Sequence, residues 1–153
     1  MQGGGAPLRA RSVQGGGAPL RAMTPFGARL RALRRARRVT LKDMAAALQV
    51  SSAYLSALEH GHRGRPSAGL VHQVNEFFGL IWDEAEELSE LAKLSHPKVT
   101  LDTGGLTPEA TALANRLADT IHRLTPQTVA AMHALLDREA PSEKPRLRRA
   151  AGR

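Results

Sequence analysis

The chain repeatedly carries the local signal of a helix start, and this signal constrains its fold most. In most cases a Ser or Thr, whose side chain caps the free N–H groups of a first turn, precedes a stretch in which apolar residues recur every three or four positions. Proline, which suits the first turn of a helix, often adjoins the cap. The signals predict seven helices, which begin near Thr24, Thr40, Ser51, Pro66, Trp82, Thr107 and Thr125. We therefore expect an all-α protein, with one short extended stretch at 99–101.

Composition excludes several classes of protein. A length of 153 residues fits about one domain with appendages. The absence of cysteine excludes disulfide scaffolds, thiol catalysis and Cys-based zinc sites. No apolar run approaches the roughly 18 residues that span a bilayer, and the five aromatic residues are too few to stack single-stranded bases. We expect a soluble, cytoplasmic protein without a cofactor or a membrane partner.

Charge is unevenly distributed along the chain. The formal net charge is +8, and 18 of the 22 basic residues are Arg. Residues 23–78 carry nine basic and three acidic side chains, whereas residues 79–140 carry five and ten. Both ends of the chain are basic. This balance makes a polyanion such as nucleic acid the first partner to consider.

Composition also predicts the domain boundaries. The sequence QGGGAPLRA occupies residues 2–10 and recurs unchanged at 14–22, and such a Gly-rich segment should be disordered. It is either a duplicated stretch upstream of a true start at Met23 or a flexible arm whose arginines enter a minor groove. The predicted parts are a disordered tail (1–22), a helical domain (23–94), a linker (95–105), a two-helix segment (106–140) and a disordered basic tail (141–153).

Two short helices joined by a tight turn, at 40–60, have the spacing of a helix-turn-helix. The motif residues occur in order as LR (33–34), VTLKDMA (39–45), VS (50–51), YLSALEHG (54–61) and PS (66–67). With them the sequence resembles, over about 24–92, the lambda-repressor-like, Xre-type (Cro/CI) family of helix-turn-helix transcriptional regulators. The resemblance implies five helices, of which the third enters the major groove of DNA, usually in a dimer. Gln49 departs from the family pattern of glycine in a left-handed turn, at a cost of up to about 1–2 kcal/mol.

The resemblance also implies which residues face the DNA bases. These are Ser52, Ala53, Ser56 and Ala57 of the third helix. None carries the guanidinium or amide group that reads a purine bidentately. Small hydroxyl and methyl groups discriminate less, so we expect specificity to come from DNA shape, water or flanking residues. The alternative for Ala53 and Ala57 is that they only provide the high helix propensity of alanine.

Phosphate contacts are expected on both sides of this helix. Arg63 and Arg65 lie among glycines in the loop directly after it, and the alternative is that this charged loop is plain solvated surface. Thr40 and Lys42 lie at the start of the second helix, whose N-terminus attracts a phosphate. The remaining expected phosphate contacts are Ser51, the hydroxyl of Tyr54, His60 and His62.

Two further expectations concern charged side chains. The resemblance implies that Arg34 and Glu59 pair inside the fold, while Arg35, Arg37 and Arg38 are divided between solvation and DNA. The pair His60 and His62 offers too few ligands for zinc, so no metal site is expected. Ser, His and Asp occur without a catalytic context such as G-x-S-x-G. The sequence therefore predicts a protein that is not an enzyme.

The predicted helices of 106–140 each carry an apolar face. They should form a hairpin with too little core to stand alone. The hairpin packs on the first domain, on a second copy of itself or on a partner such as a toxin or RNA polymerase. Self-association is favoured, because DNA-binding domains of this type gain affinity and site symmetry as dimers.

The sequence therefore predicts a transcriptional regulator that binds specific double-stranded DNA as a dimeric repressor, associated with the nucleoid. One alternative is an antitoxin that represses its own operon while residues 106–140 bind a toxin. Another is a protein-interaction module in which DNA binding is vestigial. A neighbouring toxin gene favours the antitoxin, and salt-insensitive or absent DNA binding favours the interaction module.

Overall fold

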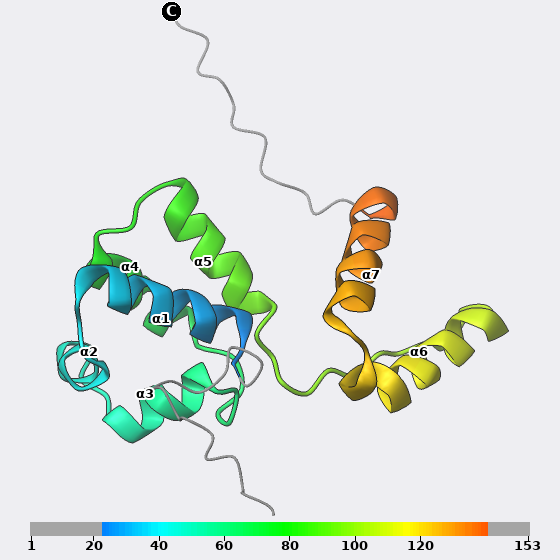
Figure 1. Cartoon of the computed structure of the whole chain (residues 1–153), viewed down its shortest axis with the longest axis horizontal. Helices are drawn as coiled ribbons and strands as arrows, with labels where there is room; N and C mark the ends of the chain where they lie inside the picture. Colours follow the sequence, from blue (N-terminus) through cyan, green and yellow to red (C-terminus); the bar gives the residue numbers. More distant parts are fainter. Residues whose placement is uncertain (1–22, 141–153) are drawn as a thin grey trace, which may run out of the picture. The chain divides into compact units, whose positions relative to one another are not determined.

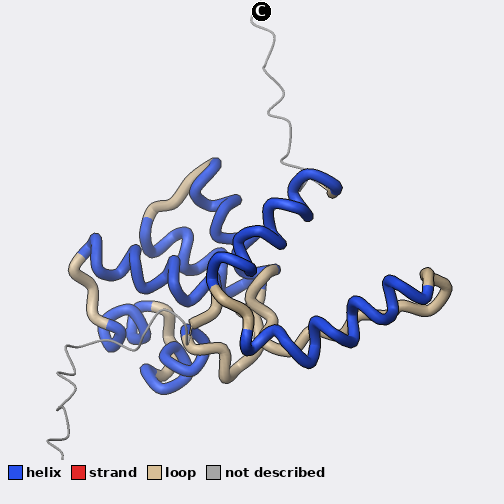
Figure 2. The backbone as a smooth tube through the Cα atoms, turned by 45° about the vertical axis from the view of Figure 1, so that its right-hand side comes forward, coloured by secondary structure: helices blue, strands red, loops and turns tan. Residues whose placement is uncertain are grey.

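The computed structural model describes residues 23–140, and the predictions made for the two tails lie outside these residues. They divide into two units, with the boundary after Val99. The first unit contains α1 (Pro25–Arg37), α2 (Leu41–Ala47), α3 (Ser52–Glu59), α4 (Ala68–Phe78) and α5 (Asp83–Lys93), and the second contains α6 (Pro108–Thr120), the 3-10 turn η2 (Ile121–Arg123) and α7 (Pro126–Glu139) (Figure 1). Every regular element in 23–140 is helical (Figure 2), so the all-α prediction is confirmed, and the extended stretch expected at 99–101 forms no strand.

Side-chain caps explain where the helices begin. In six of them a Ser or Thr oxygen accepts a hydrogen bond from the backbone N–H three residues further on, which satisfies a donor that the helix itself leaves free. These residues are Thr24, Thr40, Ser51, Ser67, Thr107 and Thr125. Helix α5 differs, because it follows Trp82 and has no side-chain cap.

Helix α1 occupies the centre of the first unit. It packs against α3 and α5, while α2 packs on α3 and α4 on α5 (Figure 1). Phe26 and Leu30 of α1 are fully buried, as the apolar spacing of this helix predicts. They share one core with side chains from the other four helices, including Met44, Leu55, Leu58, Val74 and Leu88.

Polar contacts fix both ends of α1. At its start, the Ser95 hydroxyl accepts a hydrogen bond from the backbone N–H of Phe26 at 2.8 Å and donates to the carbonyl of Leu91 at 2.5 Å. At its end, the Arg37 guanidinium donates to the carbonyl of Phe78 at 3.2 Å. Helix α1 is thereby attached to the ends of α5 and α4, beyond the apolar packing.

Two details of the expected core differ in the structure. Apolar spacing places Ile81 on the buried face of the fifth predicted helix, together with Ala85, Leu88 and Ala92, but Ile81 lies before α5 begins and is 65% exposed. Apolar spacing likewise places Phe77 on the buried face of the fourth predicted helix, together with Leu70, Val71 and Val74, but Phe78 is buried and Phe77 is only half-buried. The helix boundaries explain the exposure of Ile81, because a left-handed Gly79 ends α4 and α5 begins only at Asp83.

The second unit has helices but no buried residue in them. Leu113 of α6 and Leu136 of α7 are 62% and 63% exposed. The two helices diverge from η2 in both views, so they do not lie along each other as the expected hairpin would (Figures 1 and 2). The 3-10 turn followed by Thr125 and Pro126 starts α7 in a new direction. Two short amphipathic helices therefore leave their apolar faces uncovered within this unit.

Gly27 permits the close approach of α1 and α3. A Cβ at this position would overlap the backbone carbonyl of Glu59. We expect Gly27→Ala to lower the free energy of unfolding by at least about 2–3 kcal/mol, because backbone atoms of two helices would have to separate. Denaturant unfolding of the full chain measures this.

Gly69 of α4 provides the matched control. A Cβ there meets nothing within 4 Å. Gly69→Ala should leave stability unchanged or raise it by up to about 1 kcal/mol, as helix propensity alone predicts. Equal effects of the two substitutions would contradict the packing described for Gly27.

Candidate nucleic-acid interface

The turn between α2 and α3 has the geometry that the sequence motif predicts. Gln49 adopts a left-handed conformation, with φ of 57°. The backbone N–H of Val50 donates to the carbonyl of Ala45 at 3.0 Å, and that of Gln49 donates to Ala46 at 3.1 Å. These bonds close the end of α2 and turn the chain directly into the cap of α3. A residue with a side chain thus occupies the position for which glycine is best suited.

Helix α3 separates a buried face from an exposed face of small residues. Leu55, Leu58 and Glu59 are buried. On the other side Ser52 and Ala53 are exposed, and Ser56 and Ala57 are half-buried. All four expected base-facing residues are therefore on the outer part of the helix. No long side chain among them prevents the helix from approaching another surface closely.

Arg34 and Glu59 form an ion pair between α1 and α3. Nε of Arg34 donates to Oε1 of Glu59 at 3.0 Å, and Nη2 donates to Oε2 at 3.3 Å. The two side chains are 13% and 3% exposed, so the guanidinium neutralises a carboxylate that is almost removed from water. The carbonyl of Glu59 also accepts a hydrogen bond from the N–H of Thr24 at 3.1 Å. The last residue of α3 is thus held to α1 through its backbone and its side chain.

The loop after α3 begins with a well-defined helix end. The N–H of His62 donates to the carbonyl of Ala57 at 2.8 Å, and that of Gly61 donates to Leu58 at 3.3 Å, which is a Schellman motif. Gly61 and Gly64 both have positive φ, of 79° and 73°. The loop is therefore shaped by its glycines rather than by side-chain contacts.

Arg63 and Arg65 project from this loop into solvent. Both are exposed, and neither has a hydrogen-bond or ion-pair partner within residues 23–140. Lys42, at the start of α2, is likewise exposed and unpaired in that range. Three unneutralised cations thus flank α3, on the loop behind it and on the helix before it.

The other expected phosphate contacts differ in what their polar atoms are free to do. Thr40 and Ser51 accept the capping bonds of α2 and α3, which leaves each hydroxyl hydrogen available to an outside acceptor. Tyr54 is half-buried and packs against the core. His60 donates from Nδ1 to the carbonyl of Ser56 at 2.8 Å, so only its Nε2 remains, and this atom donates only when the ring is protonated. His62 is exposed.

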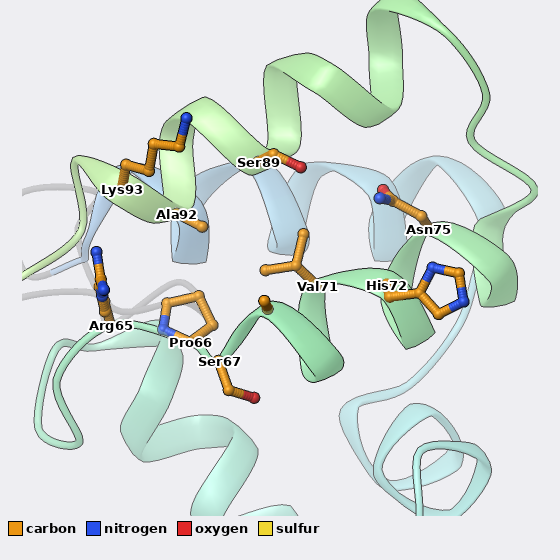
Figure 3. Close-up of a pocket in the computed structure, with 10 residues that line it drawn as sticks. Arg65, Pro66, Ser67, Val71, His72, Asn75, Ser89, Ala92 and Lys93 are labelled. Carbon is orange, nitrogen blue, oxygen red and sulfur yellow. The ribbon is translucent and has the colours of Figure 1, made fainter.

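A groove of about 400 Å³ lies between α4 and α5, and Arg65 of the loop after α3 is one of its lining residues (Figure 3). Arg65 and Lys93 lie at one end of it, and Ser67 caps α4 beside them. The Oδ1 atom of Asn75, which also lines the groove, is buried and has no hydrogen-bond partner in the described part of the chain. The groove places Arg65 next to the N-terminus of α4, whose free N–H groups attract an anion.

Neither a metal site nor a membrane-spanning element occurs in residues 23–140. The rings of His60 and His62 are nearly parallel, with centroids 6.5 Å apart, but no group of three His, Asp or Glu residues in this range is arranged to hold a metal ion. None of its helices is both long and apolar enough to cross a bilayer.

Comparison with known proteins identifies the first unit. A family model described as a helix-turn-helix domain matches residues 25–88. Residues 25–88 are a helix-turn-helix domain. This match supports the resemblance to Xre-like regulators, and it covers α1 to α4 and the first half of α5.

A curated relative agrees with this domain. Over 52 residues the chain is 42% identical to RghRB of Bacillus subtilis (strain 168), described as an uncharacterized HTH-type transcriptional regulator. The aligned part is 34% of this chain and 37% of the relative, so the likeness spans little more than a third of either protein. No solved structure matches the chain.

Sequence reasoning missed two residues that position α3. Gly27 makes the approach of α1 possible, and Ser95 attaches the start of α1 to α5. An isolated glycine inside an amphipathic helix was the available signal for Gly27, because such a residue usually has a packing reason. Ser95 gave no signal, since its partner lies 69 residues away in the sequence.

The Arg34–Glu59 pair generates a stability prediction. Glu59→Gln removes the carboxylate from a guanidinium that is 13% exposed. We expect the free energy of unfolding to fall by roughly 1–3 kcal/mol. Thermal and urea unfolding of the full chain measure it, and an unchanged melting temperature would reject the structural role of the pair.

The exposed pair of Lys93 and Glu90 provides the control. Its side chains are 66% and 55% exposed. Glu90→Gln should change stability by less than about 0.5 kcal/mol, because surface ion pairs contribute little.

Proposed function

We propose that this chain is a transcriptional regulator that binds specific double-stranded DNA with α3 in the major groove. One observation carries the proposal: the exposed small face of α3 is flanked by the unpaired cations Arg63, Arg65 and Lys42. Small side chains allow a helix to enter the groove, and cations on either side meet the phosphates of the two strands. The regulator described for the B. subtilis relative is consistent with this function.

The proposed mode of recognition relies more on fit than on base hydrogen bonds. Ser52 and Ser56 each offer a single hydroxyl, and Ala53 and Ala57 offer only methyl groups. Such contacts favour a thymine methyl or one acceptor, and they discriminate less than a bidentate arginine or glutamine. DNA shape and bridging water therefore supply part of the specificity.

We further propose that the protein acts as a homodimeric repressor assembled through the second unit. Leu113 of α6, Ile121 of η2 and Leu136 of α7 are each more than half exposed, and neither α6 nor α7 contains a buried residue. Exposed apolar surface of this kind marks an interaction site. A second copy supplies an identical face, and two recognition helices gain affinity for a palindromic site.

A protein partner on α6 and α7 is the second candidate function. The same exposed leucines fit a toxin, if the chain is an antitoxin that represses its own operon, or a subunit of RNA polymerase. The mass of the protein in solution distinguishes the two candidates. The homodimer has the mass of two copies, whereas a chain that awaits a protein partner is a monomer with both apolar faces free.

Arg63 and Arg65 are predicted to act on phosphates rather than bases. Replacing either by Ala should weaken binding about equally on a genome-mapped site and on random DNA, and should reduce the log–log salt slope by about 1. Salt titrations by fluorescence anisotropy measure both quantities. A loss confined to the mapped site would make these residues base readers. Arg138→Ala, which removes an arginine of α7 in the second unit, is the control that should leave the slope unchanged.

The dimer is predicted to depend on the apolar faces of α6 and α7. The full chain at tens of micromolar should have the mass of two copies by light scattering, and its footprint should show half-sites about 34 Å apart. Leu113→Glu with Leu136→Glu should give a monomer, because a charge is costly in an apolar interface. Asn115→Glu, on the opposite face of α6, should remain a dimer. A monomeric wild-type chain would contradict the proposal.

A further inference from the structure

The connection between α4 and α5 exposes two large apolar side chains. Ile81 is 65% exposed and Trp82, which is the single tryptophan of the chain, is 83% exposed. Tryptophan usually buries most of its large surface, and it is among the residues that interfaces favour most. Among the four connections that join α1 to α5, no other exposes a large apolar side chain to this extent.

Local structure does not account for a tryptophan at this position. Trp82 has φ of 53° and ψ of −123°, a conformation that suits glycine, and it gives α5 no side-chain cap. The connection is held in place beside it, because Leu80 is buried and its N–H donates to the carbonyl of Asn75 at 2.8 Å. The indole is thus presented from a fixed loop at a cost in backbone energy, which favours a role outside folding.

Unpaired carboxylates surround the two apolar side chains. Asp83, Glu84 and Glu86 are exposed, and none has an ion-pair partner within residues 23–140. The next two acids of α5 differ, because Glu87 pairs with Arg29 at 3.4 Å and Glu90 with Lys93 at 2.6 Å. Attraction to the helix N-terminus explains acids in a first turn. It does not explain the exposed isoleucine and tryptophan beside them.

We propose that this α5 entry surface, defined as Ile81, Trp82, Asp83, Glu84 and Glu86, docks a basic segment of a partner protein. Charge complementarity identifies the occupant, because three unpaired carboxylates attract Lys and Arg side chains and repel the phosphates of a nucleic acid. A guanidinium stacks on the indole face in a cation–π contact, which is strongest for tryptophan. The aliphatic part of the same segment covers Ile81.

This docking goes beyond DNA binding and is compatible with it. In both views of the first unit the connection between α4 and α5 lies at the edge opposite α3 (Figures 1 and 2). A partner on the α5 entry surface therefore leaves the recognition helix accessible. The regulator would hold DNA on one side and a basic protein segment on the other.

The single tryptophan makes the proposal directly measurable. Octa-arginine peptide is titrated into the full chain, and Trp82 emission is followed in the absence of DNA. We expect saturable quenching that weakens as salt is raised. Asp83→Asn with Glu84→Gln and Glu86→Gln should reduce the affinity about tenfold, since three weak ion pairs are lost. An octa-serine peptide should leave the emission unchanged.

Controls distinguish this surface from general attraction to acidic residues. Glu109→Gln with Asp119→Asn and Asp137→Asn removes three acids from α6 and α7 and should keep the affinity within twofold. With labelled octa-arginine, Trp82→Ala should also weaken binding. Emission that does not respond to the peptide, or a response equal in the two triple variants, would overturn the proposal. So would a change in Trp82 emission on adding duplex DNA alone, which would assign the surface to nucleic acid.

Discussion

The first unit depends on how Glu59, the last residue of α3, is attached to α1. Its carbonyl accepts a hydrogen bond from Thr24, its carboxylate pairs with Arg34, and its backbone packs where Gly27 has no side chain. These contacts involve the start and the last turn of α1 and thereby fix the direction of α3. Because one helix supplies all of them, α3 needs no large residue on its outer face to hold it in place. Its outer face is left to small side chains.

This attachment relates the fold to the proposed function. Helix α1 is itself held to α5 by Ser95 and to α4 by Arg37, so α3 is presented by a rigid support. The loop that follows α3 is shaped by two glycines, and it leaves Arg63 and Arg65 free of partners within the described residues. The proposed binding of DNA by close fit and phosphate neutralisation, more than by base hydrogen bonds, relies on this small-faced helix on its support and on the exposed cations beside it.

Much of the first unit could be predicted because its signals are local. Caps such as Thr24 and Ser51 follow from a few neighbouring residues, and the left-handed position of Gln49 follows from the resemblance to the Xre-type family. Features set by distant contacts were not predictable in this way. Ser95 bonds to Phe26, which lies 69 residues earlier in the chain. Ile81 is exposed because α5 begins two residues after it, at Asp83. The divergence of α6 and α7 was missed because apolar spacing shows that a face exists but not what covers it.

Amide hydrogen exchange of the full chain, with and without random-sequence duplex DNA at low salt, tests the central claim most directly. Non-specific phosphate binding suffices for this measurement, so the operator need not be known. The structure predicts slower exchange on DNA at residues 40–43, 51–57 and 60–65, with no change in α5. Protection absent from these segments, or confined to residues 81–90, would contradict the assignment of α3 and its flanking loop as the DNA-binding surface.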